Sequence, residues 1–188
     1  MRISRTNWVE VGLVAALLVG TAWLGRQVHH NYVVHGATAT SGLVTAPLAL
    51  PASGLDGAKS PLALRDVDTP KMLYVLSTEC QFCEQNMSEW RALSASLRGV
   101  GPDGPRPVVL SVSGADATRE FLDRHGLDVD VRLIDKSVLP LLGVGGYPAT
   151  LAVDPNSGAV ASWSGVLREP DHGAILAWAG VHRGAASP

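Results

Sequence analysis

The chain has 188 residues, of which 46% are hydrophobic, and its formal net charge at pH 7 is -2. This length and apolar content suffice for one globular domain with a buried core, which argues against a disordered chain. The net charge is small and the sequence has no block of basic residues, so it lacks the electrostatic footprint of a nucleic-acid-binding protein. We therefore expect no nucleic-acid partner.

The chain begins with an apolar run, residues 8–25, that is typical of a membrane signal. Tryptophans lie near both ends of the run, and Arg2 and Arg5 precede it. Because positive flanks stay in the cytoplasm, we expect residues 1–7 to be cytoplasmic and residues 8–25 to be one transmembrane helix in the lipid bilayer. A cleaved signal peptide is the alternative, since small residues at 20–22 suit a cleavage site. Either way, the rest of the chain is expected on the periplasmic side of a bacterial cytoplasmic membrane, where disulfides form.

Glycine and proline recur between residues 27 and 60, which indicates irregular structure. We assign residues 26–41 to a tether and residues 42–188 to a single domain whose first part is irregular. The sequence contains no internal repeat.

Beyond residue 70, short apolar runs alternate with amphipathic stretches. Residues 72–76 are continuously apolar, which predicts a strand buried on both faces, and Met87, Trp90, Leu93 and Leu97 then recur at helical spacing. The next predicted elements are a strand at 108–112, a helix at 115–125 with Ala117, Phe121 and Leu122 inward and Gly126 as C-cap, an edge-like segment at 129–133, a hairpin of strands 150–153 and 159–163, and a helix at 171–182 with Ile175, Trp178 and Ala179 against the sheet. This order predicts an α/β domain in which helices flank a mixed sheet.

The chain has two cysteines, Cys80 and Cys83, at the junction between the first apolar strand and the helix after it. We expect Ser77 and Thr78 to cap this helix, which places Cys80 in its first turn, where backbone N–H groups favour a thiolate. Cysteines at i and i+3 share one helix face and can form a disulfide, so Cys80 is the expected nucleophile and Cys83 the resolving thiol. A structural zinc site would need further ligands, a c-type haem would need histidine at Glu84, and a disulfide closing so short a loop would add little stability.

With these motifs, the chain resembles the thioredoxin-like superfamily, and within it the membrane-anchored thiol-disulfide oxidoreductases of the TlpA and ResA type. The resemblance rests on the Cys80–Cys83 junction, on Gly145-Gly146-Tyr147-Pro148-Ala149-Thr150 at the start of a strand, and on the turn at residues 154–158; residues 46–50 and 55–57 look like the entry to the domain in that group. It implies a thioredoxin-like fold preceded by one transmembrane helix. It also implies exchange of disulfides with protein thiol substrates, often in cytochrome c maturation, and a membrane or periplasmic thiol as electron donor.

The resemblance further implies that Pro148 follows a cis peptide bond and faces the cysteines. Gly146, Tyr147 and Pro148 would then contact the substrate, which pairs as an extra strand with the Tyr147 backbone. Taken alone, the same residues could be an ordinary loop before a strand.

The sequence departs from the family pattern on both sides of the cysteines. Glu79 replaces the common aromatic residue and Phe82 replaces the common proline, and no acid is present in the preceding strand. Glu79 and Glu84 are candidates for tuning the thiols, with Glu79 as a proton acceptor, or they are simply solvated carboxylates at a helix start. Negative neighbours without a nearby histidine or lysine disfavour a thiolate, so we expect a reductant or a mild exchanger and not a strong oxidant.

No cofactor beyond the redox-active Cys80–Cys83 disulfide is expected. His125, His172 and His182 are scattered along the sequence, so we predict no metal site. Two other functions stay open. A peroxiredoxin-like peroxidase shares the fold, although Leu73 stands where the motif of that family has proline, and a non-catalytic membrane-tethered binding module could keep the disulfide for stability alone.

Overall fold

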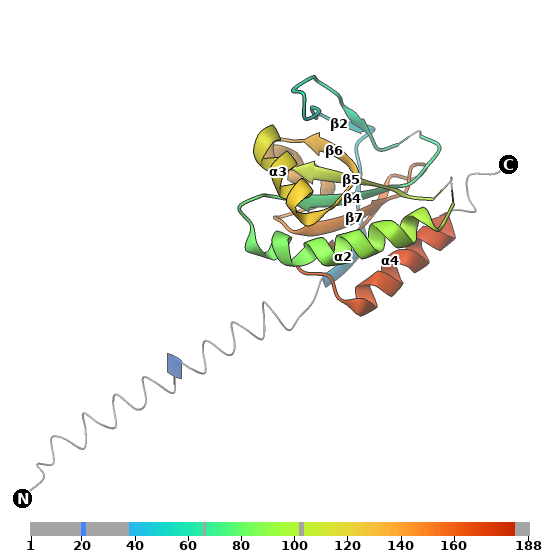
Figure 1. The fold of residues 1–188 in the computed structure, drawn as a ribbon. Coiled ribbons are helices and arrows are strands. Elements are labelled where there is room, and N and C mark those ends of the chain that lie inside the picture. Colours follow the sequence, from blue (N-terminus) through green and yellow to red (C-terminus); the bar gives the residue numbers. More distant parts are fainter. Residues whose placement is uncertain (1–19, 22–37, 66, 102–103, 183–188) are drawn as a thin grey trace, which may run out of the picture. The chain divides into compact units, whose positions relative to one another are not determined.

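The computed structural model describes residues 20–21, 38–65, 67–101 and 104–182, and the domain is built on a six-stranded sheet (Figure 1). The order of strands across the sheet is β1 (Thr38–Thr45), β8 (Ala159–Ser164), β7 (Ala149–Val153), β4 (Lys71–Leu76), β5 (Arg106–Ser111) and β6 (Asp130–Leu133). β4 runs parallel to β5 and antiparallel to β7, so the predicted mixed sheet is confirmed.

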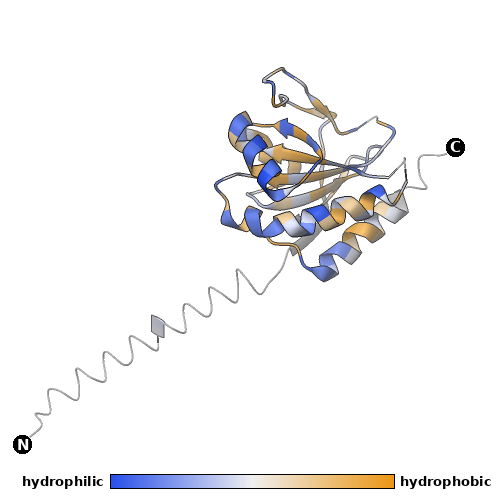
Figure 2. Ribbon diagram, viewed as in Figure 1, coloured by the Kyte–Doolittle hydropathy of each residue, from blue (hydrophilic) through white to orange (hydrophobic). Residues whose placement is uncertain are grey.

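Three helices cover one face of this sheet: α2 (Gln81–Arg98), α3 (Ala115–His125) and α4 (Glu169–His182). The side chains of β4 alternate between the two faces, and Met72, Tyr74 and Leu76 point to the helical side. The residues predicted to face inward from the helix after the cysteines, Met87, Trp90, Leu93 and Leu97, are all buried there. α2 and α4 lie side by side (Figure 1). In Figure 2 the strands are largely orange, which marks hydrophobic residues, while the helices also carry blue, hydrophilic stretches.

The other face of the sheet carries less regular structure. Leu73 and Val75 of β4 pack there against the 3-10 helix η2 (Lys136–Leu142) and the small sheet formed by β2 (Ala49–Leu50) and β3 (Leu62–Ala63). Both faces of β4 are therefore buried, as its continuously apolar sequence predicts. η2 contains Pro140 and was not predicted, because a seven-residue segment is too short to show a helical period.

The beginning of the domain differs from the prediction. β1 starts at Thr38, inside the range 26–41 assigned to the tether, and pairs with β8. Backbone pairing with β8, and not an apolar alternation of its own, gives this segment its strand conformation. Of the predicted membrane span, residues 8–25, all but residues 20–21 lie outside the described residues. Within the described ranges, no helix has the length and apolar character of a membrane span.

α3 has the predicted bounds, and Gly126 ends it with a left-handed φ of 63°, a conformation that glycine adopts without strain. One of its inward residues was predicted wrongly. Ala117 is exposed, whereas Thr118 is fully buried and its hydroxyl lies 2.8 Å from Ser111 Oγ at the end of β5. The buried hydrogen bond lets a polar residue take the core position that an apolar periodicity would give to alanine.

Candidate active site

The two cysteines lie at the amino-terminal end of α2, but Cys80 has a different position from the one predicted. It is the N-cap residue, with an extended backbone (φ −93°, ψ 107°), and its Sγ accepts a hydrogen bond of 3.2 Å from the Cys83 N–H. The predicted cap at Ser77 and Thr78 is therefore wrong, since the sulfur of Cys80 itself takes the capping role. This arrangement holds the sulfur at the positive end of the helix, where negative charge is favoured.

The two thiols differ in access to solvent. Both are free thiols, with Cys80 partly exposed and Cys83 completely buried. Burial raises the pKa of the Cys83 thiol, and its hydrogen bond with Cys80 raises it further. An incoming disulfide can therefore reach Cys80, while Cys83 stays protonated and shielded.

The segment before β7 forms the other half of the site. The Tyr147–Pro148 peptide bond is cis, and the Tyr147 carbonyl oxygen lies 3.8 Å from Cys80 Sγ, as acceptor for its thiol. Gly146 is exposed, Tyr147 is half-buried and Pro148 is buried. Lys136 Nζ lies 5.8 Å from the centre of the Tyr147 ring, within the range of a cation–π contact.

The sheet explains why residues far apart in sequence meet here. β4 and β7 are antiparallel neighbours with Val75 opposite Ala149, so the end of β4 and the start of β7 lie at the same edge of the sheet. The cysteines follow β4 and Tyr147 precedes β7. The three sequence motifs that carry the family resemblance thus belong to adjacent strands, and two of them converge at one place.

A cluster of hydroxyl groups lies beside the cysteine segment and was missed from the sequence. Ser113 Oγ accepts hydrogen bonds from the Thr78 backbone N–H at 3.0 Å and from the Thr78 hydroxyl at 3.1 Å, and lies 3.4 Å from Ser77 Oγ. Parallel β4 and β5 end together, with Leu76 opposite Ser111, so the polar residues that follow each strand become neighbours. The sequence signal that could have indicated this cluster is the presence of hydroxyl residues directly after two neighbouring parallel strands. The cluster fixes the turn that leads to Cys80.

The two carboxylates proposed to tune the thiols point to solvent. Glu79 is exposed, and its backbone N–H donates to Ser77 Oγ at 3.4 Å. The Glu84 side chain is 57% exposed, and its carboxylate lies 3.8 Å from His125 Nε2. Exposure of both groups supports the alternative that they are solvated carboxylates at a helix start.

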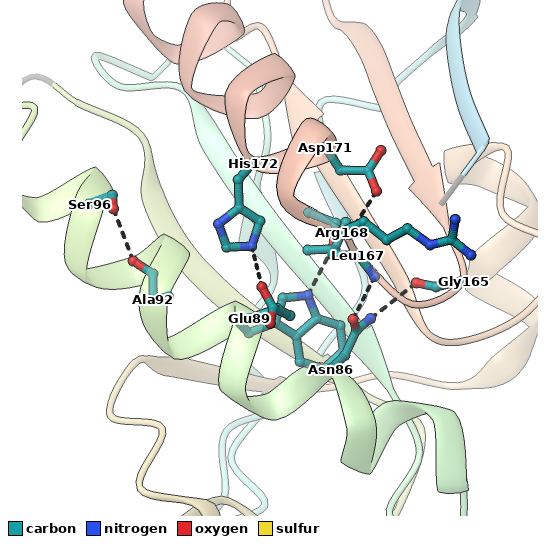
Figure 3. A network of polar contacts seen from close by, with 11 residues as sticks. Asn86, Glu89, Ala92, Ser96, Gly165, Leu167, Arg168, Asp171 and His172 are labelled. Carbon is teal, nitrogen blue, oxygen red and sulfur yellow. Dashed lines mark hydrogen bonds and ion pairs between the residues drawn. The ribbon is translucent and has the colours of Figure 1, made fainter. Parts of the chain in front are cut away.

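Two of the histidines contact carboxylates of α2. Besides the His125 contact, His172 Nε2 of α4 lies 3.0 Å from Glu89 Oε2, which joins α4 to the middle of α2 (Figure 3). The His182 side chain lies outside the part of the chain whose side chains are described. Within that part, no three metal-binding side chains come together.

Comparison with known proteins connects this geometry to a fold. No protein-family profile matches the chain, and no curated protein sequence does. Among solved structures, a secreted thiol-disulfide isomerase from Corynebacterium glutamicum is 16% identical, with a TM-score of 0.58 over 74% of this chain and 84% of that chain. A secreted disulfide oxidoreductase from Mycobacterium tuberculosis, described as homologous to E. coli DsbE, is 17% identical, with a TM-score of 0.53 over 69% and 96%. StoA from Bacillus subtilis is 10% identical, with a TM-score of 0.54 over 71% and 98%. The resemblance inferred from the sequence is confirmed at the level of architecture: this chain has a thioredoxin-like fold.

Proposed function

We propose that the protein is a thiol-disulfide oxidoreductase that exchanges disulfides with protein thiol substrates through Cys80 and Cys83. One observation carries the proposal: a partly exposed sulfur that caps α2 lies 3.8 Å from the Tyr147 carbonyl, with a second, buried thiol three residues away. The solved structures with this fold include proteins named for the same chemistry. No cofactor beyond the cysteine pair takes part.

The reaction proceeds in two exchanges and transfers two electrons. The Cys80 thiolate attacks one sulfur of a substrate disulfide, which forms a mixed disulfide and expels the other substrate sulfur as a thiolate. Cys83 then gives its proton to the substrate thiolate released in the first exchange and attacks Cys80 Sγ, which closes the Cys80–Cys83 disulfide and releases the second substrate thiolate. The protein pair is oxidised and the substrate is reduced. A dithiol donor must then reduce the pair again, and we expect a membrane or periplasmic thiol protein in that role.

Tyr147 and Gly146 form the substrate platform in this proposal. An extended substrate segment would pair with the backbone around Tyr147, which brings its sulfur to Cys80. Phe82, between the cysteines, is 39% exposed and offers an apolar contact at the rim of the same site. Buried Pro148 anchors the platform at the start of β7.

We expect the protein to work as a reductant. Burial raises the pKa of the Cys83 thiol and so favours its protonated form. The reduced pair is therefore not strongly stabilised as a thiolate, which disfavours an oxidant of high potential. Reduction of substrate cysteines during cytochrome c maturation, or a related maintenance of thiols, fits this direction.

The proposed location is the outer side of a bacterial cytoplasmic membrane, with residues 8–25 as a single anchor. The apolar run and its arginine flank support this topology, and two of the similar structures are described as secreted proteins. Protease added to intact spheroplasts should digest the chain beyond about residue 40, because an anchor with its positive flank in the cytoplasm leaves the domain outside the membrane. A protected domain would contradict the orientation, and a soluble processed form would favour a cleaved signal.

Trapping of substrates tests the chemistry. In Cys83→Ala, the mixed disulfide on Cys80 cannot be resolved, so covalent partners that are released by dithiothreitol should accumulate. Cys80→Ala is the matched control and should trap none. Trapping through Cys83 alone would reverse the assigned roles. Sulfenic acid formed on Cys80 by peroxide, without trapping, would support a peroxidase, and a pair inert to alkylation would support a binding module.

A further inference from the structure

Asn86 is a completely buried polar residue on α2, one turn beyond Cys83. Both ends of its side-chain amide are paired with the backbone of the loop between β8 and α4 (Figure 3). Nδ2 donates to the Gly165 carbonyl at 3.1 Å, and Oδ1 accepts from the Leu167 N–H at 2.8 Å. Asn86 thus fixes this loop to the helix that carries the cysteines.

The same loop is bonded to the other half of the site. The Gly165 N–H donates to the Pro148 carbonyl at 2.9 Å. A path of two hydrogen bonds therefore runs from Asn86 through Gly165 to Pro148, next to the carbonyl of Tyr147 that faces Cys80. Trp90 also joins α2 to β7, through Thr150 Oγ1, but that bond lies further along the strand, away from the platform.

We propose that Asn86 is a positioning residue for disulfide exchange: through Gly165 it holds Pro148, and with it the substrate platform of Tyr147 and Gly146, at the working distance from Cys80. The proposal rests on the proposed function. Cys80 and Tyr147 are separated by 67 residues, and no covalent link near the site fixes their separation. Because a misplacement of about 1 Å between reacting groups can slow a reaction about a hundredfold, a loosened platform slows the reaction with a substrate that must dock there.

Asparagine suits this position for a chemical reason. The loop presents one acceptor, the Gly165 C=O, and one donor, the Leu167 N–H, and a neutral amide supplies one partner to each. Alanine would leave both backbone groups unpaired. Ionised aspartate would keep the bond to Leu167 but lose the donor to Gly165, and only its protonated form could restore both.

The first test measures amide hydrogen exchange in the reduced full-length protein in detergent. In Asn86→Ala, the Leu167 amide loses its acceptor directly and exchanges faster. The Gly165 amide keeps its acceptor, Pro148, so faster exchange there, by about tenfold or more for the loss of one buried hydrogen bond, shows that Asn86 holds the platform. Ser94→Ala, on the same helix as Asn86, is the matched control, because it removes a buried hydrogen bond to Tyr74 of β4. An unchanged Gly165 rate, or an equal change in the control, would overturn the proposal.

The second test compares two reactions of Cys80. Reduction of a peptide disulfide needs the platform, whereas alkylation by iodoacetamide needs only the thiol. In Asn86→Ala, the rate of peptide reduction should fall about tenfold or more, as for a displaced reacting group, while alkylation changes less than about twofold. Equal losses in both reactions would mean a general disturbance and refute a positioning role. A wild-type protein that reduces no disulfide would refute the proposed function instead. The amide-exchange measurement would then still test whether Asn86 holds the platform.

If Asn86→Ala does not fold, Asn86→Asp decides. Its rate of peptide reduction relative to wild type should rise as the pH falls, because protonation restores the donor to Gly165. A ratio that stays low and does not change with pH would contradict the proposal, whereas a constant ratio near one would show an aspartate that stays protonated and would support it.

Discussion

Replacing Thr150 with valine should destabilise the domain by removing a buried acceptor between α2 and β7. Thr150 and Trp90 are both completely buried, and the indole N–H donates to Thr150 Oγ1 at 2.9 Å. Valine keeps the shape and the strand preference of threonine but leaves the indole N–H without its partner. The cost of an unsatisfied buried donor is about 1–3 kcal/mol, and for a domain of this size each kcal/mol lowers Tm by about 2–4 °C.

The assay is urea and thermal unfolding of the reduced protein, followed by far-UV circular dichroism. Thr45→Val is the matched control: Thr45 is an exposed residue at the end of β1, and this change should stay within about 0.5 kcal/mol. Trp90→Phe alone should lower the free energy of unfolding. Combined with Thr150→Val it should lower it by less than the sum of the two single changes, because the two residues share one interaction. If Thr150→Val were as stable as Thr45→Val, the bond between α2 and β7 would not contribute as we argue.

Three further perturbations test other parts of the structure. Gly143→Ala should lower the free energy of unfolding, measured in urea, by about 1–3 kcal/mol, because φ is 69° and the new Cβ would lie 2.6 Å from the Val44 side chain. Gly145→Ala is the control and should change the free energy of unfolding little, because a Cβ there meets open space. Equal effects of the two changes would contradict the claim that Gly143 is needed for its backbone conformation. Burial raises the pKa values of Cys83 and Tyr74, so both side chains stay protonated in the folded protein at a pH where they ionise in the unfolded chain. The reduced protein should therefore lose stability as the pH rises above about 9, the ordinary pKa of a cysteine thiol. Unfolding curves between pH 7 and 10.5 should show this fall, and a rise would refute the sign. Ser113→Ala should speed proteolysis of the turn before Cys80 and cost about 1 kcal/mol, and an unaltered proteolytic pattern would mean that its bonds to the turn do not order it.

The regular elements near the site could be predicted because their signals are local. The continuous apolar run of β4, the helical spacing after Cys83 and the glycine that ends α3 each act within a few residues. The hairpin of β7 and β8 followed from its turn, where Asp154 Oδ1 accepts from the N–H groups of Asn156 and Ser157. Propensity and periodicity are enough for such elements.

The remaining features depend on partners distant in sequence. Asn86 is bonded to Gly165 and Leu167, about eighty residues away, and no local pattern around it in the sequence indicates these contacts. The cap of α2 was predicted wrongly because serine and threonine are better caps than cysteine in general, and only the structure shows that Ser77 and Thr78 bond to Ser113 instead. Tertiary contacts here override local preference.

The most direct test of the central claim is the equilibrium of the cysteine pair with glutathione redox buffers, read by alkylation and mass spectrometry. We predict that Cys80 and Cys83 oxidise together to one internal disulfide in a two-electron transition, at a potential more negative than about −200 mV, as expected of a reductant. Two cysteines that remain reduced throughout, or that each take up glutathione without forming an internal disulfide, would contradict the account.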